Sequence, residues 1–572
     1  MNYLGVYHSD YSRSNSGIFD APCITVGRMM LCGRGCFSRG KRLALAWGRL
    51  RDGKTLASAL GCSEEATAAE LVLRAYERWG EDYPSYIEGP VVSCVMDAES
   101  DALVLSRDRM GEKPVFYAKH GDSLAFSDHP DALLKAAKVD PAVNADGLRE
   151  LFGLGPARSP GITPYRDMLA LEPGCVLVAR GGDIAISCYW RIEDMPHGED
   201  TPTTIRHTRE MLERCVVEAV ALSPAVMLSG GLDSSALTAL LKDSVSPLRS
   251  FSVDYQDNAR DFRANAFRPE MDAPYVLAAV RAFGTQHRTV TLTQRELAAG
   301  LDKAVSLRGF PGMADIDSSL MLFAEQIARM DNCVVSGECG DEVFGGYPWF
   351  KGNGPLEGFP WSGSLELREG LLLPELRDQL KLREYVADVF SMRRAMADPG
   401  AGFEPNERRL RTLQRLCFEF FMPNLQERAM RMCDGAGLEV LTPLCDERLV
   451  QYVYNVPWEM KFMGGQEKGL FREAVADLLP EKLLWRTKSP YPKTCSPEFS
   501  GIVRIMALRL AEDRDAPIFR LIDRKKLKKL AQSALDPVDT PWFGQLMAGP
   551  QLLGYLWQVN SWLRERDVQV EV

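Results

Sequence analysis

Hydrophobic and polar positions follow two patterns along the chain, and the change between them falls near residue 200. Before it, short apolar runs such as 91–96 stand between turn signals and predict strands, beside one amphipathic helix over 67–79. A polar, proline-containing stretch covers 193–204, and beyond it strand-like runs alternate with amphipathic helices, as in a parallel α/β sheet. We therefore predict a strand-rich α+β domain over 1–192, a linker over 193–204 and a parallel α/β domain over 205–566.

The predicted elements of the second domain place its loops. The strands cover 225–228, 248–255, 288–292 and 333–336, and the helices begin at Ser234 and cover 272–283 and 317–330. In open α/β sheets, ligands bind at the carboxyl ends of the strands. We therefore expect the chemistry of this domain in the loops that follow its strands.

The loop after the first of these strands has the features of a phosphate site. The strand Ala225–Leu228 runs into the turn Ser229-Gly230-Gly231, and a helix begins directly afterwards. Backbone N–H groups and the positive end of the helix dipole would then point at one place, and the glycines let an anion approach closely. Asp233 would repel a phosphate unless a cation lay between them, so the loop predicts pyrophosphate with Mg²⁺. A serine-glycine turn that only caps a helix is the alternative.

A second acidic, glycine-rich loop follows a later strand. The segment 336–347 reads SGECGDEVFGGY and carries Glu338, Asp341 and Glu342. Taken alone, it could be a solvated turn. Because the carboxyl ends of parallel strands lie along one edge of a sheet, it could instead share a site with Asp233.

Composition and charge narrow the classes of function. A chain of 572 residues is too long for a single core, and its net charge of −10 argues against a nucleic-acid surface. Cys32 and Cys36 are the closest pair of the 14 cysteines, and no second pair completes a zinc site, so we expect free thiols in a reducing cytoplasm. Neither a signal peptide nor an apolar run of 18 residues occurs. The sequence predicts a cytoplasmic protein without nucleic-acid or membrane partners.

Several motifs resemble one enzyme family. SGGLDSS at 229–235 resembles the pyrophosphate loop of the ATP-pyrophosphatases, and SGECGDEVFGGY resembles the G-E-G-x-D-E-x-F-G-G-Y signature of asparagine synthetases. The segments 457–470 (PWEMKFMGGQEKGL) and 484–494 (LWRTKSPYPKT) also look like the synthetase domain, and 541–556 resembles its helical C-terminal tail. This resemblance covers nearly the whole chain and implies an ATP-pyrophosphatase domain with a helical C-terminal part.

The resemblance also implies a set of site residues. ATP would lie on Leu228, Ser229, Gly230, Gly231, Asp233, Ser234, Ser235, Val253, Ser336, Gly337 and Lys468. Asp233 and Asp341 would hold Mg²⁺. Glu338 would accept a proton from the attacking amine, and Lys488 would offset charge at the α-phosphate and the forming tetrahedral centre. Lys468 and Arg472 are spaced to share a helix face that could reach phosphate, although a solvated basic face fits equally.

The N-terminal domain resembles the N-terminal-nucleophile glutaminase fold but departs from it at the chemistry. SRDRMGEKPVFY at 106–117 and GDSLAFSD at 121–128 carry the resemblance. Active relatives expose a cysteine at position 1, whereas Cys23 is the first cysteine here, and their N-G-E-I-Y-N segment is replaced by 47–51 (WGRLR). We therefore expect a scaffold without amidohydrolase activity, in which Asp108 is structural.

The sequence departs from the family pattern again near the expected acceptor pocket. In the segment 425–446, Met430 and Leu441 replace an aspartate and an arginine of the family pattern, and 433–435 (CDG) replaces Ser-Met-Ala. Because a zwitterion such as aspartate needs charged partners, we expect an acceptor that is larger or less polar than aspartate.

The resemblance implies an ATP-dependent ligase that adenylylates a carboxylate and couples it to an amine. Without a glutaminase the amine could belong to the substrate, as in the lasso-peptide cyclases of this family, which close a macrolactam ring. We therefore favour a peptide macrolactam synthetase, which could work with a leader peptidase and a precursor-recognition protein. An asparagine synthetase that uses free ammonia and a β-lactam-type ring-closing synthetase remain alternatives, and so does a non-catalytic scaffold.

Overall fold

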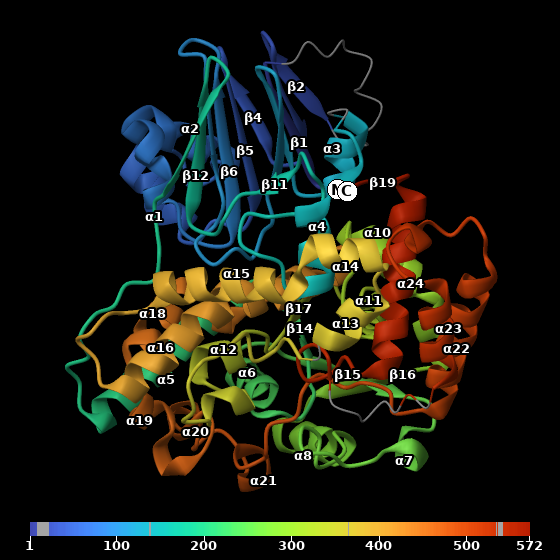
Figure 1. Ribbon diagram of the computed structural model, residues 1–572. Helices are drawn as coiled ribbons and strands as arrows, with labels where there is room; N and C mark the ends of the chain where they lie inside the picture. The colour runs from blue at the N-terminus through green and yellow to red at the C-terminus, as the bar shows by residue number, and fades with distance from the viewer. Residues whose placement is uncertain (9–21, 137–138, 364, 534, 536–540) are drawn as a thin grey trace. The chain divides into compact units, whose positions relative to one another are not determined.

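The structure is a computed structural model, and it describes residues 1–8, 22–136, 139–363, 365–533, 535 and 541–572 (Figure 1). The chain folds into two compact units. The first contains Met1–Gly147, Ser159–Ile192 and Gln569–Glu571, and the second contains Leu148–Arg158, Glu193–Val568 and Val572. In the described part of the chain, no helix is both long and apolar enough to cross a membrane.

Two antiparallel sheets form the first unit. In strand order, one consists of β11 (Leu169–Ala170), β8 (Phe116–His120), β9 (Ser123–Ser127), β1 (Tyr3–Tyr7), β3 (Met29–Gly33) and β2 (Cys23–Val26). The other consists of β13 (Asp183–Cys188), β12 (Cys175–Arg180), β7 (Ala102–Ser106), β6 (Val91–Asp97), β5 (Arg42–Gly48) and β4 (Cys36–Arg39). Buried side chains of both sheets share one core, as in a β-sandwich.

Helices complete the first unit. They are α1 (Gly53–Leu60), α2 (Ala68–Trp79) and α3 (Pro130–Ala136), and α4 (Ala145–Arg149) spans the boundary between the units. Thr67 begins α2 by accepting a hydrogen bond from the Glu70 N–H, and Val72 and Ala75 pack on the outer face of the second sheet. A short parallel pair, β10 (Ala142–Asn144) and β19 (Gln569–Glu571), also belongs to this unit.

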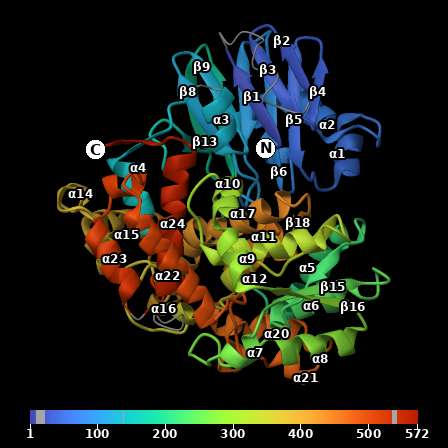
Figure 2. The same ribbon diagram turned by 90° about the vertical axis from the view of Figure 1, so that its right-hand side faces the viewer.

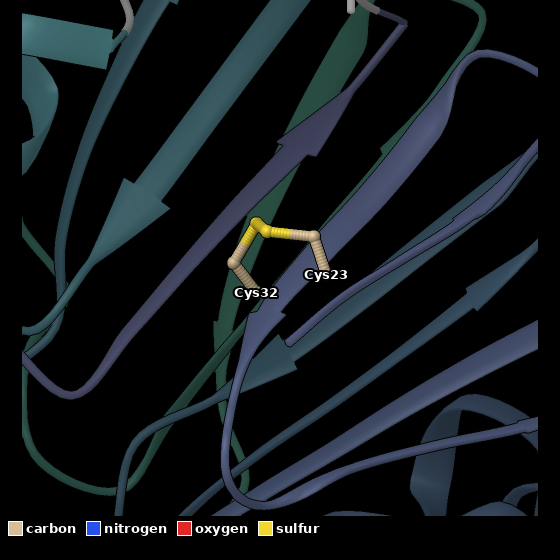
Figure 3. The surroundings of a disulfide bond; sticks show 2 residues. All are labelled: Cys23 and Cys32. Carbon is tan, nitrogen blue, oxygen red and sulfur yellow. A yellow bond between two sulfur atoms is a disulfide. The ribbon is translucent and has the colours of Figure 1, made fainter. Parts of the chain in front are cut away.

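Cys23 on β2 and Cys32 on β3 form a disulfide (Figure 3). They lie directly opposite each other in the antiparallel register, with 4.0 Å between their Cα atoms. The prediction of free thiols is therefore wrong for this pair. The sequence pattern did not indicate that 23–26 and 29–33 form a hairpin, and only that pairing brings two cysteines nine positions apart into contact.

The second unit is built on a five-stranded parallel sheet. Its order is β16 (Gln286–Leu292), β15 (Arg249–Tyr255), β14 (Ala225–Met227), β17 (Cys333–Val335) and β18 (Glu439–Leu441). In Figures 1 and 2, α6 (Leu232–Leu241) and α8 (Ala273–Phe283) lie on one face, and α11 (Asp315–Ile327) and α17 (Met422–Asp434) lie on the other. Coverage of both faces explains why β14 and β17 are runs of apolar residues.

The remaining helices of this unit surround the sheet. They are α5 (Thr201–Val220), α7 (Asn258–Asp261), α9 (Gln294–Ala299), α10 (Leu301–Arg308), α12 (Gly340–Phe344), α13 (Leu365–Leu371), α14 (Pro374–Leu380), α15 (Leu382–Ala397), α16 (Pro405–Leu416), α18 (Glu447–Asn455), α19 (Trp458–Lys461), α20 (Gly469–Ala474), α21 (Glu481–Leu484), α22 (Pro497–Glu512), α23 (Arg524–Gln532) and α24 (Gly549–Glu565). The predicted linker is partly helical, because Asp200 caps α5 through a hydrogen bond from the Thr203 N–H and the helix begins at Thr201.

Candidate active site

The turn between β14 and α6 is held open by its own serines. Ser234 Oγ accepts a hydrogen bond from the Ser229 N–H at 3.2 Å, and the Gly231 N–H donates to Ser229 Oγ at 3.3 Å. Gly230 has φ 70°, and a Cβ there would lie 2.6 Å from the backbone of Tyr275. Only glycine fits this position, so it allows the turn to pack directly against the backbone of Tyr275.

The acidic loop after β17 packs closely against this turn. Strands β14 and β17 are parallel neighbours, so the segments that follow them leave the same edge of the sheet. A Cβ on Gly337 would lie 3.0 Å from Asp233 Cβ, and a Cβ on Gly340 would lie 2.7 Å from Asp233 Oδ1. Two glycines of the second loop therefore make room for the aspartate of the first.

The two predicted metal ligands, Asp233 and Asp341, converge on one ammonium group. Lys468 Nζ lies 2.7 and 2.6 Å from the two carboxylate oxygens of Asp233 and 2.6 Å from Asp341 Oδ1. Lys488 Nζ lies 2.5 Å from Asp341 Oδ2. Two carboxylates and two ammonium groups thus form a compact, largely buried cluster.

This cluster changes the proton affinity of its members. Burial disfavours the Asp341 carboxylate, but the Lys468 and Lys488 ammonium groups outweigh it and lower the pKa of Asp341 to about 2. Burial also disfavours the Lys468 ammonium, and the two aspartates outweigh it, so the pKa of Lys468 is raised. The neighbouring Glu342 behaves differently: burial and the charge of Asp341 raise its pKa to about 8, while the Tyr347 hydroxyl donates to it at 2.7 Å. Asp341 and Lys468 are therefore ionised near neutral pH, whereas Glu342 holds its proton.

A cavity lies beside this cluster and includes most of the predicted site. The predicted residues that line it are Leu228, Ser229, Gly231, Asp233, Ser234, Val253, Ser336, Gly337, Glu338, Asp341, Lys468 and Lys488. Gly230 and Ser235 are not among its lining residues: Gly230 packs on the backbone of Tyr275, and the Ser235 side chain is buried in α6. These two residues shape the loop behind the cavity.

The structure differs from the expected helix face of Lys468 and Arg472, and it places Met430 and Leu441 outside the cavity lining. Lys468 does not share a helix face with Arg472, because it precedes α20 in a left-handed conformation with φ 56°. That conformation turns Lys468 toward the aspartates, while Arg472 donates to the backbone carbonyl groups of Glu467 and Arg486. Met430 and Leu441 are buried and do not line the cavity themselves, but their chain neighbours Ala429 and Val440 do.

The sequence analysis did not identify two arginines that line the cavity, Arg428 and Arg486, each of which contacts a distant segment of the chain. Arg428 on α17 lies 2.9 Å from Glu338 Oε1. Arg486 donates to the Ser229 carbonyl at 3.0 Å and pairs with Asp272. A lone arginine in an amphipathic helix or a loop gives no sequence signal, because the partners of Arg428 and Arg486 are 90 and 257 positions away.

In the first unit, the Asp108 side chain stabilises a turn of the backbone. It is buried, and its carboxylate accepts hydrogen bonds from the Glu112 and Lys113 N–H groups at 2.8 and 2.9 Å. Trp47, in the segment that replaces the glutamine-binding motif, packs on Tyr3 with ring centroids 5.4 Å apart. These contacts stabilise a turn and a core, in keeping with the scaffold role expected for this domain.

Comparison with known proteins places the chain in a family. Residues 207–564 match the family model described as asparagine synthase, and residues 55–190 match a glutamine amidotransferase domain. The chain belongs to the asparagine synthase family. It is 37% identical over 518 residues to glutamine-hydrolyzing asparagine synthetase 3 of Bacillus subtilis, a match that covers 89% of this chain and 84% of that protein. It is also 26% identical over 293 residues to putative glutamine-hydrolyzing asparagine synthetase 2 of Methanocaldococcus jannaschii, covering 50% and 55% of the two chains.

Membership of the asparagine synthase family settles the class of reaction. The chain is an ATP-dependent ligase that forms C–N bonds and releases AMP and pyrophosphate. The predicted fold class is confirmed as well: a glutaminase-like α+β domain of the N-terminal-nucleophile type precedes a parallel α/β synthetase domain with a helical C-terminal part.

A methyl group at Gly346 should test the acidic cluster. A Cβ there would lie 2.1 Å from Asp341 Oδ1 and 2.3 Å from Lys468 Cε, so Gly346→Ala must displace one of them. We expect ligase activity, measured as AMP formation, to fall by about 10²-fold, as for an ångström-scale displacement in a catalytic site. Gly354→Ala is the matched control, since a Cβ there meets no atom within 4 Å. Equal activity of both variants would contradict a role of this cluster.

Proposed function

We propose that this enzyme forms an acyl-adenylate in the cavity beside Asp233 and Asp341 and transfers the acyl group to a nitrogen that its own amidotransferase domain does not supply. The observation that carries the proposal is the shared ammonium of Lys468, which lies 2.6 Å from carboxylate oxygens of two separate loops. Carboxylates arranged around one cation provide the charge and the donor atoms that Mg²⁺ with a bound polyphosphate requires.

The residues present fit a magnesium site that is completed by the nucleotide. The described residues contain no group of three or more histidine, cysteine or acidic side chains placed to bind a metal, so the protein offers the two aspartates alone. Mg²⁺ in nucleotide enzymes is commonly held by one or two carboxylates together with phosphate oxygens. Asp233 and Asp341 would hold the ion, which would neutralise charge on the departing pyrophosphate. Lys468 would then be released from the aspartates to pair with phosphate.

Other groups of the cavity have roles in the two chemical steps. The turn 229–231 and the N-terminus of α6 would hold the phosphates through N–H groups. Lys488 would offset the charge that develops as the carboxylate attacks and again as the nitrogen attacks the acyl-adenylate. Glu338 would accept the proton of the attacking nitrogen, and its ion pair with Arg428 fixes its position.

We further propose that the nitrogen belongs to the substrate, so that the enzyme closes a macrolactam between a peptide amine and an acidic side chain. Two departures from the glutaminase pattern support an outside source of nitrogen: the segment 47–51, whose partly buried Trp47 packs against a core, and Asn2 in place of the nucleophilic cysteine of active relatives. A leader peptidase and a precursor-recognition protein would be partners in that case. Asparagine synthesis from free ammonia is the second candidate, and the 37% identity to a Bacillus subtilis asparagine synthetase favours it.

The nitrogen source can be tested directly. The purified enzyme would be given ATP and Mg²⁺ with aspartate plus ammonium, with aspartate plus glutamine, or with a peptide carrying a free N-terminus and an internal acidic residue. We expect AMP and pyrophosphate only with the peptide, together with a product that has lost one water. Turnover with aspartate and ammonium would replace the macrolactam proposal by the second candidate. Turnover with glutamine as the only nitrogen donor would contradict the inactive amidotransferase domain.

A further inference from the structure

The charged side chains that line the cavity differ in whether they already have a partner, and this difference decides which groups of a second substrate they can bind. The acidic side chains of the cavity are Asp233, Asp272, Glu338, Asp341 and Glu467. Each of them already has a cationic partner. Asp233 pairs with Lys468, Asp272 with Arg486, Glu338 with Arg428, Asp341 with Lys468 and Lys488, and Glu467 with Lys351. An ammonium group held beside the acceptor carboxylate would have to break one of these ion pairs, and a buried ion pair is costly to break. The attacking amine differs, because in the proposed mechanism it gives its proton to Glu338.

Arg428, in contrast to these paired carboxylates, has nitrogen donors that lack a hydrogen-bond partner among the described residues. Its side chain is 2% exposed and lines the cavity, and Nη2 donates to Glu338 at 2.9 Å. Nε and Nη1 are buried and have no hydrogen-bond partner among the described residues. The ring of Tyr491 packs against the guanidinium at 4.8 Å but accepts no conventional hydrogen bond. Because unsatisfied buried donors of a charged group are costly, Arg428 is prepared to receive an anionic oxygen.

The wall around Arg428 is apolar. Leu425, Ala429 and Cys433 follow one another at intervals of four along α17, so they share the helix face that turns toward the cavity with Arg428. Leu320 and Phe323 of α11, which packs against α17, line the same cavity. A substrate part that contacts these residues gains free energy by burying carbon rather than charge.

From these observations we infer that the acceptor is a carboxylic acid whose neighbouring nitrogen is acylated, with an apolar group, and that Arg428 binds its carboxylate oxygen. This inference rests on the proposed function and specifies its substrate class. An acidic residue inside a peptide has this chemistry, since its nitrogen is an uncharged amide, whereas the ammonium of free aspartate would compete with the cations that already pair with the cavity's carboxylates. Arg428 is a specificity-determining residue in this account, and Glu338 remains the proton acceptor.

Three probe acids separate the effect of the ammonium group from the effect of the apolar group. L-Aspartate, N-acetyl-L-aspartate and N-benzoyl-L-aspartate share their carboxylates and differ in the ammonium and in the apolar group. Hydroxylamine would trap the acyl-adenylate as a hydroxamate with release of AMP. We expect kcat/KM to rise in the order in which the acids are named, by about 100-fold from first to last, the scale of one unpaired buried charge. Preference for L-aspartate would overturn the inference.

Two variants test the residues. Arg428→Lys retains a cation for Glu338 but lacks the spare nitrogen donors, so KM for N-benzoyl-L-aspartate should rise by about 10-fold or more while kcat changes less. Leu425→Asn should lower activity with the benzoyl acid more than with the acetyl acid. An unchanged KM in Arg428→Lys, or an equal effect of Leu425→Asn on both acids, would contradict the inference.

Failure of the proposed function would have a different outcome. If no acid supported AMP formation, or if Asp233→Asn left ATP–pyrophosphate exchange unchanged, then the ligase site itself would be wrongly placed. Normal exchange that depends on Asp233, combined with a preference for L-aspartate, would reject the acceptor class alone.

Discussion

Asp341→Asn is expected to lower ATP–pyrophosphate exchange by about 10²–10³-fold, beyond what its effect on the stability of the fold would explain. The substitution removes one of the two carboxylates that would hold Mg²⁺ and takes away the ion pairs that Asp341 makes with Lys468 and Lys488. The loss of stability is limited because Lys468 retains both oxygens of Asp233, and Lys488 retains the Ser489 carbonyl at 3.2 Å. The exchange is measured with the acceptor acid that the wild-type enzyme uses, and calorimetry measures the loss of MgATP affinity.

Asp331→Asn is the matched control for this experiment. Asp331 is also a buried carboxylate in an ion pair, with Arg249 as its partner, and it lies outside the cavity. Its replacement should lower the free energy of unfolding without changing exchange. The reverse result, in which the control loses exchange and Asp341→Asn retains it, would remove the physical basis of the proposed metal site.

The strand–loop–helix units of the second domain could be predicted because their signals are local. The run 225–228 and the glycines after it predict a strand that ends in a turn, and the structure has β14 and α6 there. The convergence of Asp233 and Asp341 also follows from sequence, since parallel neighbouring strands deliver their loops to one edge. Local pattern and sheet topology agree at this site.

Contacts between distant segments could not be predicted in the same way. Lys468 meets Asp233 across 235 positions, and its left-handed backbone, which sets its direction, has no signature in the residues around it. Met430 and Leu441 mark a loss of charge near the expected acceptor pocket, yet the side chains that line the cavity are their neighbours Ala429 and Val440. A shift of one position on a helix or a strand turns a side chain to another face, and a sequence comparison alone does not resolve it.

Glu427→Gln is expected to be among the most destabilising single changes in the second unit, at about 3–5 kcal/mol at pH 7. The Glu427 carboxylate lies 2.7 Å from Arg158 Nη2 and 3.9 Å from Arg308 Nη2, and the Arg308 side chain is fully buried. Removing the negative charge leaves Arg158 without this partner and Arg308 with Asp317 alone as its ion-pair partner among the described residues. Urea unfolding at pH 7 measures the loss, with Glu473→Gln on the exposed side of α20 as the control.

The same substitution has a defined pH dependence. Burial disfavours the Glu427 carboxylate, but Arg158, Arg308 and Arg431 outweigh it and lower its pKa to about 2 from an ordinary value of 4.5. A lowered carboxyl pKa stabilises the fold fully above the unfolded pKa, and this stabilisation is lost as the pH falls through the folded pKa. The difference between wild type and Glu427→Gln should therefore stay constant from pH 7 to about 5 and shrink below 4.5 by about 1.4 kcal/mol for each pH unit. A difference that stayed constant down to about pH 3 would contradict this electrostatic origin, because glutamine has nearly the shape of glutamate and differs from it mainly in charge.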